Sequence, residues 1–152
     1  MASLMLPVRN VFYFALCCVI FASVSLCSSP VSSSPQNPVI VGGTVSLEGK
    51  YLETSRMIKL GYEMWAANVN ERGGLLGREI RLVFYDDKSS PDLVRTYYRK
   101  LIEEDGAELI LSPYGTPLTL AASEITEEAG RVMIACASAA PKPWERGHRF
   151  LF

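Results

Sequence analysis

The sequence predicts an α/β protein built on a parallel sheet with helices on both faces. Short, largely apolar runs of strand length alternate along the chain with longer amphipathic segments of helical period. Glycine pairs and proline-containing caps separate the two kinds of segment. Strands that alternate with helices are joined by right-handed crossovers, so we expect these strands to lie parallel in one sheet.

Four strands are expected from the apolar runs, at residues 39–44, 80–85, 109–111 and 132–136. Residues 150–152, three apolar side chains at the end of the sequence, are predicted to begin a fifth strand. A domain rarely ends on an unpaired apolar strand, because such an edge invites aggregation. We therefore expect the chain to be the N-terminal part of a longer protein and the sheet to be incomplete at its C-terminus.

The first helix is expected from about Thr54 to Arg72, where the pair Gly73-Gly74 ends it. Apolar side chains recur through it at the spacing of one helical face. The stripe expected to face the sheet is Ile58, Gly61, Tyr62, Trp65 and Val69.

An N-cap residue followed by proline predicts the start of each of the other two helices. Ser90 is the expected N-cap of the second, with Pro91 at its first position and its end near Gly106. Its predicted buried residues are Val94, Tyr97, Leu101 and Ile102. Thr116 and Pro117 repeat the signal for the third helix. Its predicted buried residues are Leu118, Ala121, Ala122, Ile125 and Ala129.

Residues 1–27 are predicted to be a secretory signal peptide. Arg9 gives a positively charged start, residues 11–26 are uncharged and almost wholly apolar, and small residues follow. We therefore expect export, to the periplasm or the cell surface. Two alternatives stay open: residues 11–27 could remain as a membrane tether, or Cys27 could carry a lipid anchor.

Residues 28–38 have the serine- and proline-rich composition of a flexible linker, and residues 39–152 form the expected domain. The formal net charge of −1 argues against a nucleic-acid partner, which would require a basic surface. Cys136 is the one cysteine in the expected domain, and we interpret it as a buried thiol without a redox role.

Catalytic and metal chemistry are not predicted. Asp86 and Asp87 are neighbours at a strand end, so their side chains would point to opposite faces, and we interpret them as a turn device or a solvated edge. His148, the single histidine, lies in a charged stretch that we expect to be an exposed loop. Phosphate-binding loops, nucleophile elbows and zinc spacings are absent from the sequence. The sequence therefore predicts a protein that is not an enzyme and uses no cofactor.

Three loops are candidates for ligand binding because each follows the carboxyl end of a predicted strand. They are residues 46–51, 112–116 and 135–140, all rich in small or hydroxylic residues. The second loop leads into a helix at Thr116, where free N–H groups and the helix dipole favour an anion such as a carboxylate. The alternative is that Thr116 is an ordinary N-cap and Ser138 an ordinary loop residue. Their joint placement favours binding.

Several motifs in order resemble the type 1 periplasmic binding proteins, which include the leucine/isoleucine/valine-binding proteins of ABC importers. The sequence reads VNERGGLLGREI over residues 69–80 and YDDKSSP over residues 85–91. It then reads PYGTPLT over residues 113–119 and ACASAAP over residues 135–141, where that family has two ligand loops. The resemblance extends over the whole domain from Val39 onward.

The resemblance implies a protein of two lobes that clamps a solute between them, with this chain forming most of the first lobe. It implies that the loop at Thr116 holds the α-carboxylate of an amino acid. The residues that match the family's ligand contacts or line its side-chain pocket are Tyr114, Gly115, Thr116, Ala137, Ser138, Ala139, Glu48 and Tyr51. Two departures matter. The best-known branched-chain binders carry a disulfide between the loops that here contain Ser89 and Gly115, so that bridge is absent here, and relatives often have threonine in place of Ala139.

The expected function is therefore the extracytoplasmic solute-binding component of an ABC importer. The expected partners are a small polar solute, an amino acid above all, and the permease subunits of the importer. An alternative is the ligand-sensing ectodomain of a receptor or regulator, which would carry a membrane-spanning or signalling segment after the lobe. An enzyme of doubly wound fold is a third class, which the fold alone does not exclude.

Overall fold

The computed structural model describes residues 37–152. The predicted signal peptide and most of the predicted linker lie outside the described residues. Within the described chain, four parallel strands form one sheet in the order β2-β1-β3-β4. These strands are β1 (Val39–Val45), β2 (Ile80–Asp86), β3 (Leu109–Leu111) and β4 (Met133–Ile134). The predicted α/β class and parallel sheet are confirmed.

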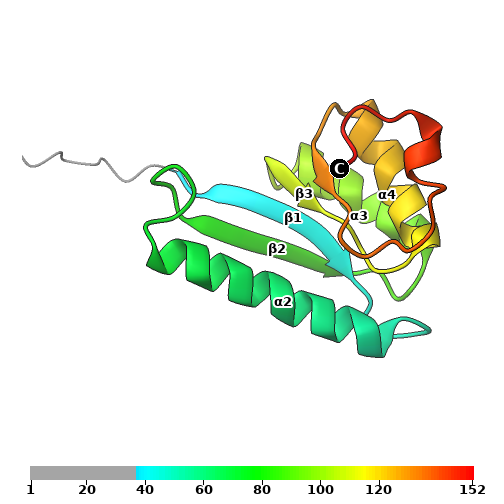
Figure 1. The fold of residues 1–152 in the computed structure, drawn as a ribbon, viewed down its shortest axis with the longest axis horizontal. Helices are drawn as coiled ribbons and strands as arrows, with labels where there is room; N and C mark the ends of the chain where they lie inside the picture. The colour runs from blue at the N-terminus through cyan, green and yellow to red at the C-terminus, as the bar shows by residue number, and fades with distance from the viewer. Residues whose placement is uncertain (1–36) are drawn as a thin grey trace, which may run out of the picture. The chain divides into compact units, whose positions relative to one another are not determined.

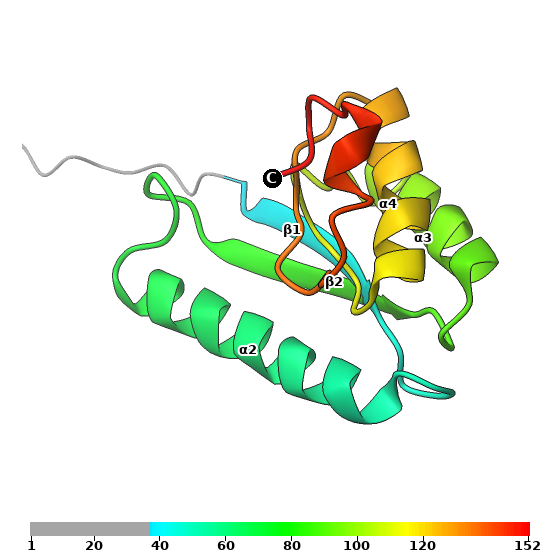
Figure 2. The same cartoon turned by 45° about the vertical axis from the view of Figure 1, so that its right-hand side comes forward.

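Helices cover both faces of this sheet (Figures 1 and 2). Helix α2 (Leu52–Glu71) packs on one face, over β1 and β2. Helices α3 (Pro91–Glu103) and α4 (Thr116–Glu128) pack against each other on the opposite face. Each helix runs back against the strands, so its N-terminus lies near the edge at which the strands end. We call this the carboxyl edge of the sheet.

Strand β1 lies between β2 and β3, and all seven of its residues are buried. Its side chains alternate between the two cores: Ile40 joins the cluster of α3 and α4, whereas Val39 and Val41 join the cluster of α2. Gly42 allows α3 to pack closely, because a Cβ atom there would lie 2.9 Å from Leu101 Cδ2. The absence of a side chain at this position therefore sets the distance between α3 and the sheet.

The face that α2 turns to the sheet differs from the predicted one. Ser55, Tyr62 and Ala66 are its buried residues, whereas Gly61 is exposed and Trp65 keeps 39% of its surface exposed. The prediction of a buried Trp65 was wrong because the true stripe is rotated by about one residue. Small side chains at two of the buried positions let the helix lie close to β1 and β2.

Helix α3 begins as predicted. Ser90 is its N-cap, and the Ser90 hydroxyl accepts a hydrogen bond from the N–H of Leu93 at 3.5 Å. The helix ends at Glu103, before the predicted end near Gly106.

Tyr98 is the aromatic residue of α3 that is fully buried, and its hydroxyl donates to the carbonyl of Leu111 at 2.7 Å. Tyr97, which was predicted to be the buried one, is half-buried and stacks on Tyr85 with ring centroids 4.9 Å apart. Of two adjacent tyrosines, the one whose hydroxyl reaches a strand carbonyl occupies the core.

Helix α4 starts one residue earlier than predicted. Gly115 occupies the N-cap with φ 93°, and Thr116 is already helical, so the prediction of Thr116 as the N-cap was wrong. Ala129, expected to be buried, is exposed beyond the end of the helix. The helix is otherwise more buried than its apolar stripe predicted, and its additional buried residues are Thr119, Ser123 and Thr126.

The last residues extend the sheet beyond β4. Leu151 forms a parallel bridge with Met133, and the N–H of Phe152 donates to the carbonyl of Met133 at 3.0 Å. These residues pair beside β4 through one isolated bridge, but they do not form an assigned fifth strand in the described chain. His148, predicted to be exposed, is half-buried in the segment that leads to it. Among residues 37–152, every helix is too short or too polar to cross a membrane.

Candidate functional site

The three candidate loops meet at the carboxyl edge. They follow β1, β3 and β4, which are adjacent in the sheet and parallel, so their ends lie side by side. The loop after β1 covers residues 46–51, the loop after β3 covers residues 112–115, and the loop after β4 covers residues 135–140. The topology therefore brings together segments that are separated by about 20 to 90 positions in the sequence.

Two hydrogen bonds join the loops after β3 and β4. The N–H of Gly115 donates to the carbonyl of Ala137 at 2.9 Å. The Ser138 hydroxyl donates to the Thr116 hydroxyl at 3.2 Å. Both hydroxyl-bearing residues are half-buried, so the pair remains within reach of a small molecule at this edge.

An aromatic contact joins the loops after β1 and β3. The ring of Tyr51 meets the ring of Tyr114 edge to face, with centroids 5.6 Å apart. The same Tyr51 ring lies against Gly115, where a Cβ atom would come within 3.4 Å of Tyr51 Cζ. Because Gly115 also has φ 93°, both its backbone conformation and its neighbour favour glycine.

The N-terminus of α4 supplies the anion-binding chemistry of this edge. The N–H groups of Thr116 and Leu118 have no acceptor inside the helix, since the first turn of a helix lacks such partners. They lie at the positive end of the helix dipole, which favours a carboxylate. The Thr116 hydroxyl makes no cap and accepts only from Ser138, so its hydrogen can be donated to a ligand. The N–H of Gly115 is already bound to Ala137, so Gly115 contributes shape and not a donor.

Two predicted site residues lack a described contact with the other six. The Glu48 carboxylate lies 3.6 Å from Lys88 Nζ at an exposed position. Ala139 is exposed at the tip of its loop. Six of the eight predicted site residues thus form one connected group, and Glu48 and Ala139 lie at its margin.

A buried carboxylate that sequence reasoning underrated lies beneath the loop after β1. Asp87 is fully buried and accepts hydrogen bonds from the Thr44 hydroxyl at 2.7 Å, the Ser46 hydroxyl at 2.5 Å and the N–H of Ser89 at 2.9 Å. Asp86 accepts from the N–H groups of Leu47 and Lys88 through one oxygen. The turn role predicted for this pair is confirmed, but Asp87 does not lie at a solvated edge. Hydroxyl groups at alternate positions, Thr44 in β1 and Ser46 directly after it, were the signal that pointed to it.

Tyr62 of α2 contacts residues that follow β3 and β4, from the face of the sheet that α2 covers. Its hydroxyl donates to the carbonyl of Ser112 at 3.0 Å and lies 2.9 Å from Cys136 Sγ. Burial raises the pKa of Tyr62 well above its ordinary value of 10.0, with a further contribution from Cys136, so the phenol stays protonated. Cys136 is exposed, so the prediction of a buried thiol was wrong.

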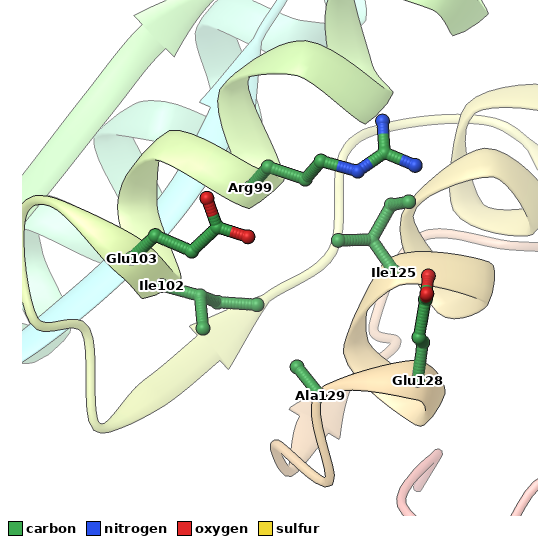
Figure 3. Close-up of a pocket in the computed structure, with 6 residues that line it drawn as sticks. All are labelled: Arg99, Ile102, Glu103, Ile125, Glu128 and Ala129. Carbon is green, nitrogen blue, oxygen red and sulfur yellow. The ribbon is translucent and has the colours of Figure 1, made fainter.

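One groove in the described part of the chain lies away from the three loops. A groove of about 250 Å³ opens between the C-terminal halves of α3 and α4 (Figure 3). Its lining residues are Arg99, Ile102, Glu103, Ile125, Glu128 and Ala129. Because these helices run back from the carboxyl edge, the groove lies at the opposite end from Thr116. Among residues 37–152, no three side chains of His, Cys, Asp or Glu cluster as a metal site would require.

An open parallel sheet with small loops and a helix N-terminus at its carboxyl edge defines the class of α/β proteins that bind small molecules there. The family model described as periplasmic binding protein matches residues 38–152. The chain therefore belongs to the periplasmic binding protein family, as the sequence resemblance implied.

Known proteins agree with this assignment. The Leu/Ile/Val-binding protein homolog 2 of Brucella abortus is 28% identical over 128 residues, which are 84% of this chain and 34% of that protein. The solved LivJ substrate-binding protein of Streptococcus pneumoniae, in complex with isoleucine, superposes with a TM-score of 0.71 at 20% identity, over 76% of this chain and 33% of LivJ. A putative branched-chain amino acid ABC transporter from Silicibacter pomeroyi superposes with a TM-score of 0.65 at 28% identity, over 76% of this chain and 30% of that chain.

The chain thus spans about a third of the length of these relatives. The family and its structural neighbours are substrate-binding proteins, so the prediction that the chain is not an enzyme is confirmed. Several of these relatives are named as leucine-, isoleucine- and valine-binding proteins.

Proposed function

We propose that this chain is the first lobe of an exported solute-binding protein that delivers an amino acid to an ABC importer. In this proposal residues 1–27 direct export, residues 28–38 are a linker and residues 39–152 form the lobe. The second lobe would close over the carboxyl edge. The solute would then lie between the loops after β1, β3 and β4.

The observation that carries the proposal is the hydroxyl pair at the start of α4. Ser138 donates to Thr116 at 3.2 Å, beside the unpaired N–H groups of the first turn. A carboxylate accepts hydrogen bonds and carries negative charge, so it matches both the hydroxyl groups and the positive helix end. This chemistry supports a solute that carries a carboxylate, as every amino acid does.

The proposed side-chain pocket lies beside the carboxylate position. Tyr51 and Tyr114 present aromatic faces next to Gly115. Aromatic rings provide apolar contact area for an aliphatic side chain. The names of the relatives, which include leucine, isoleucine and valine, agree with such a pocket. We therefore propose a branched-chain amino acid as the first solute to test.

The names of the chain's relatives favour the importer over the sensing alternative. The relatives compared above are named as binding proteins and as parts of transporters. In the proposal the partners are the solute and the permease subunits, and the protein acts in the periplasm or at the cell surface.

A thermal-shift screen against the free amino acids tests the proposal. The protein is expressed from its complete reading frame without the predicted signal peptide. A solute present at about 100 times its dissociation constant stabilises a protein by about 2.7 kcal/mol, which is a readily measured shift. The proposal expects a shift with leucine, isoleucine or valine. Shifts with none of the twenty amino acids would reject an amino-acid solute.

A further inference from the structure

The Ser89 hydroxyl joins the loop after β1 to the turn after β2. It donates a hydrogen bond to the carbonyl of Glu48 at 2.9 Å and accepts one from the N–H of Tyr51 at 3.1 Å. One side-chain oxygen thus contacts both ends of the segment between Glu48 and Tyr51. Gly49 lies directly over it, since a Cβ atom at Gly49 would come within 2.9 Å of Ser89 Oγ.

Ser89 is itself held in place by the buried Asp87. Its N–H donates to Asp87 Oδ1 at 2.9 Å, and Asp87 is fixed in turn by the hydroxyl groups of Thr44 and Ser46. The backbone of Ser89 has φ 59°, a region that side-chain-bearing residues rarely adopt. A strained conformation persists only where the surroundings determine it, and here the buried Asp87 does so.

The other end of this connection is the candidate site. Tyr51 follows the segment that Ser89 holds, and its ring lies against Gly115 and Tyr114. Tyr51 is also the N-cap of α2, but no side-chain hydrogen bond fastens it there. The position of its N–H is therefore fixed by Ser89.

We propose that Ser89 is a positioning residue that sets the place of Tyr51 in the solute site. The proposal rests on the proposed function of this edge and extends it to a residue that does not contact the solute. Ser89 acts through two hydrogen bonds from a backbone conformation that glycine would adopt more readily. The hydroxyl, and not the backbone, is the part of Ser89 that the loop requires.

Two substitutions separate the hydroxyl from the backbone strain. Ser89→Ala removes the hydroxyl and keeps the strain, whereas Ser89→Gly removes both. Leu76→Gly is the matched control, because Leu76 has a similar φ of 54° but is 90% exposed at the opposite end of the sheet. All three are made in the protein expressed from its complete reading frame.

Three quantities are measured for each variant. Hydrogen–deuterium exchange of residues 48–52 is the direct readout of the loop. The affinity for isoleucine and the melting temperature are the other two. Both Ser89 variants are expected to exchange about tenfold faster at the Tyr51 amide and to bind isoleucine about tenfold more weakly. The melting temperature should nevertheless be higher for Ser89→Gly than for Ser89→Ala. Leu76→Gly should leave exchange in residues 48–52 and affinity unchanged.

Unchanged exchange at the Tyr51 amide in Ser89→Gly would overturn the proposal. So would an affinity for isoleucine that falls only in proportion to the melting temperature across the variants. If the parent protein binds no amino acid while loop exchange responds as expected, the proposed function fails and the positioning of Tyr51 by Ser89 stands. The two failures are therefore distinguishable.

Discussion

The Ser138 hydroxyl donates a hydrogen bond to the Thr116 hydroxyl across 22 positions of sequence. This bond links the loop after β4 to the first residue of α4, where the N–H groups of the helix are unpaired. Thr116 accepts this bond through its oxygen, so its own hydroxyl hydrogen is left to donate. The pair therefore presents a donor to any anion that settles at the helix end.

Replacing Thr116 by alanine should weaken solute binding more than it weakens the fold. A hydrogen bond to a charged group is worth about 1.5–3 kcal/mol, so affinity for the solute should fall about 10- to 100-fold. The free energy of unfolding should change by about 1 kcal/mol or less, since no cap is lost and only the half-buried hydrogen bond from Ser138 is removed. Calorimetric titration and urea unfolding measure the two quantities. Thr96→Ala, on the exposed side of α3, is the matched control and should leave affinity unchanged.

Two glycine-to-alanine substitutions should have opposite effects on stability. Gly115→Ala places a Cβ atom at φ 93° and 3.4 Å from the Tyr51 ring, so it should cost about 1–3 kcal/mol and also weaken binding. Gly61→Ala lies in the middle of α2 with no atom within 4 Å of the added Cβ. It should stabilise the protein by up to about 1 kcal/mol. Equal effects of the two in thermal unfolding would contradict this account of Gly115.

The two adjacent aspartates should differ sharply when replaced by alanine. Asp87→Ala leaves the buried hydroxyl groups of Thr44 and Ser46 without their acceptor and should cost at least about 2 kcal/mol. Asp86→Ala removes an acceptor that water can replace, because Leu47 and Lys88 are exposed. Its cost should be about 1 kcal/mol or less. Urea unfolding of the pair measures the difference, and a costlier Asp86→Ala would refute the role given to Asp87.

Glu127 makes stability depend on pH. The N–H groups of Arg149 and Phe150 donate to its carboxylate, and the first of these is the largest cause that lowers the pKa of Glu127 from its ordinary value of 4.5. A carboxylate whose pKa is lower in the folded state stabilises the fold above its unfolded pKa, and this contribution is lost as pH falls through the folded value.

The parent protein should therefore be more stable than Glu127→Gln at pH 7, and the two should converge as the pH falls below 4.5. Chemical unfolding at a series of pH values measures this convergence. Glu128→Gln, an exposed neighbour on the same helix, is the control and should follow the parent protein. A difference between parent and Glu127→Gln that does not change with pH would contradict the role of this carboxylate.

The sequence was sufficient to predict the order of strands and helices, because apolar runs and proline caps are local signals. It did not determine which face of a helix is buried where two stripes compete. In α2 the small residues Ser55 and Ala66 lie inside and the large Trp65 outside, since closeness to the sheet outweighs side-chain size. In α3 the choice of Tyr98 over Tyr97 depends on a carbonyl of β3 that is distant in sequence.

The candidate site was predicted as three loops, and the parallel topology brings them together. The details that sequence could not supply are tertiary. Gly115 takes the cap position that Thr116 was expected to fill, because its positive φ turns the chain into the helix one residue early. The buried role of Asp87 depends on hydroxyl groups of β1, which lie more than 40 positions away.

The central claim is that the start of α4 holds the carboxylate of an amino acid. Calorimetric titration of the protein, expressed from its complete reading frame, with isoleucine and with isoleucinamide tests it most directly, because the amide keeps the side chain and the ammonium group but lacks the carboxylate. We predict saturable binding of isoleucine and binding of isoleucinamide that is at least about 100-fold weaker, the upper end of the loss expected for charged hydrogen bonds. Equal binding of both compounds, or binding of neither, would contradict the claim.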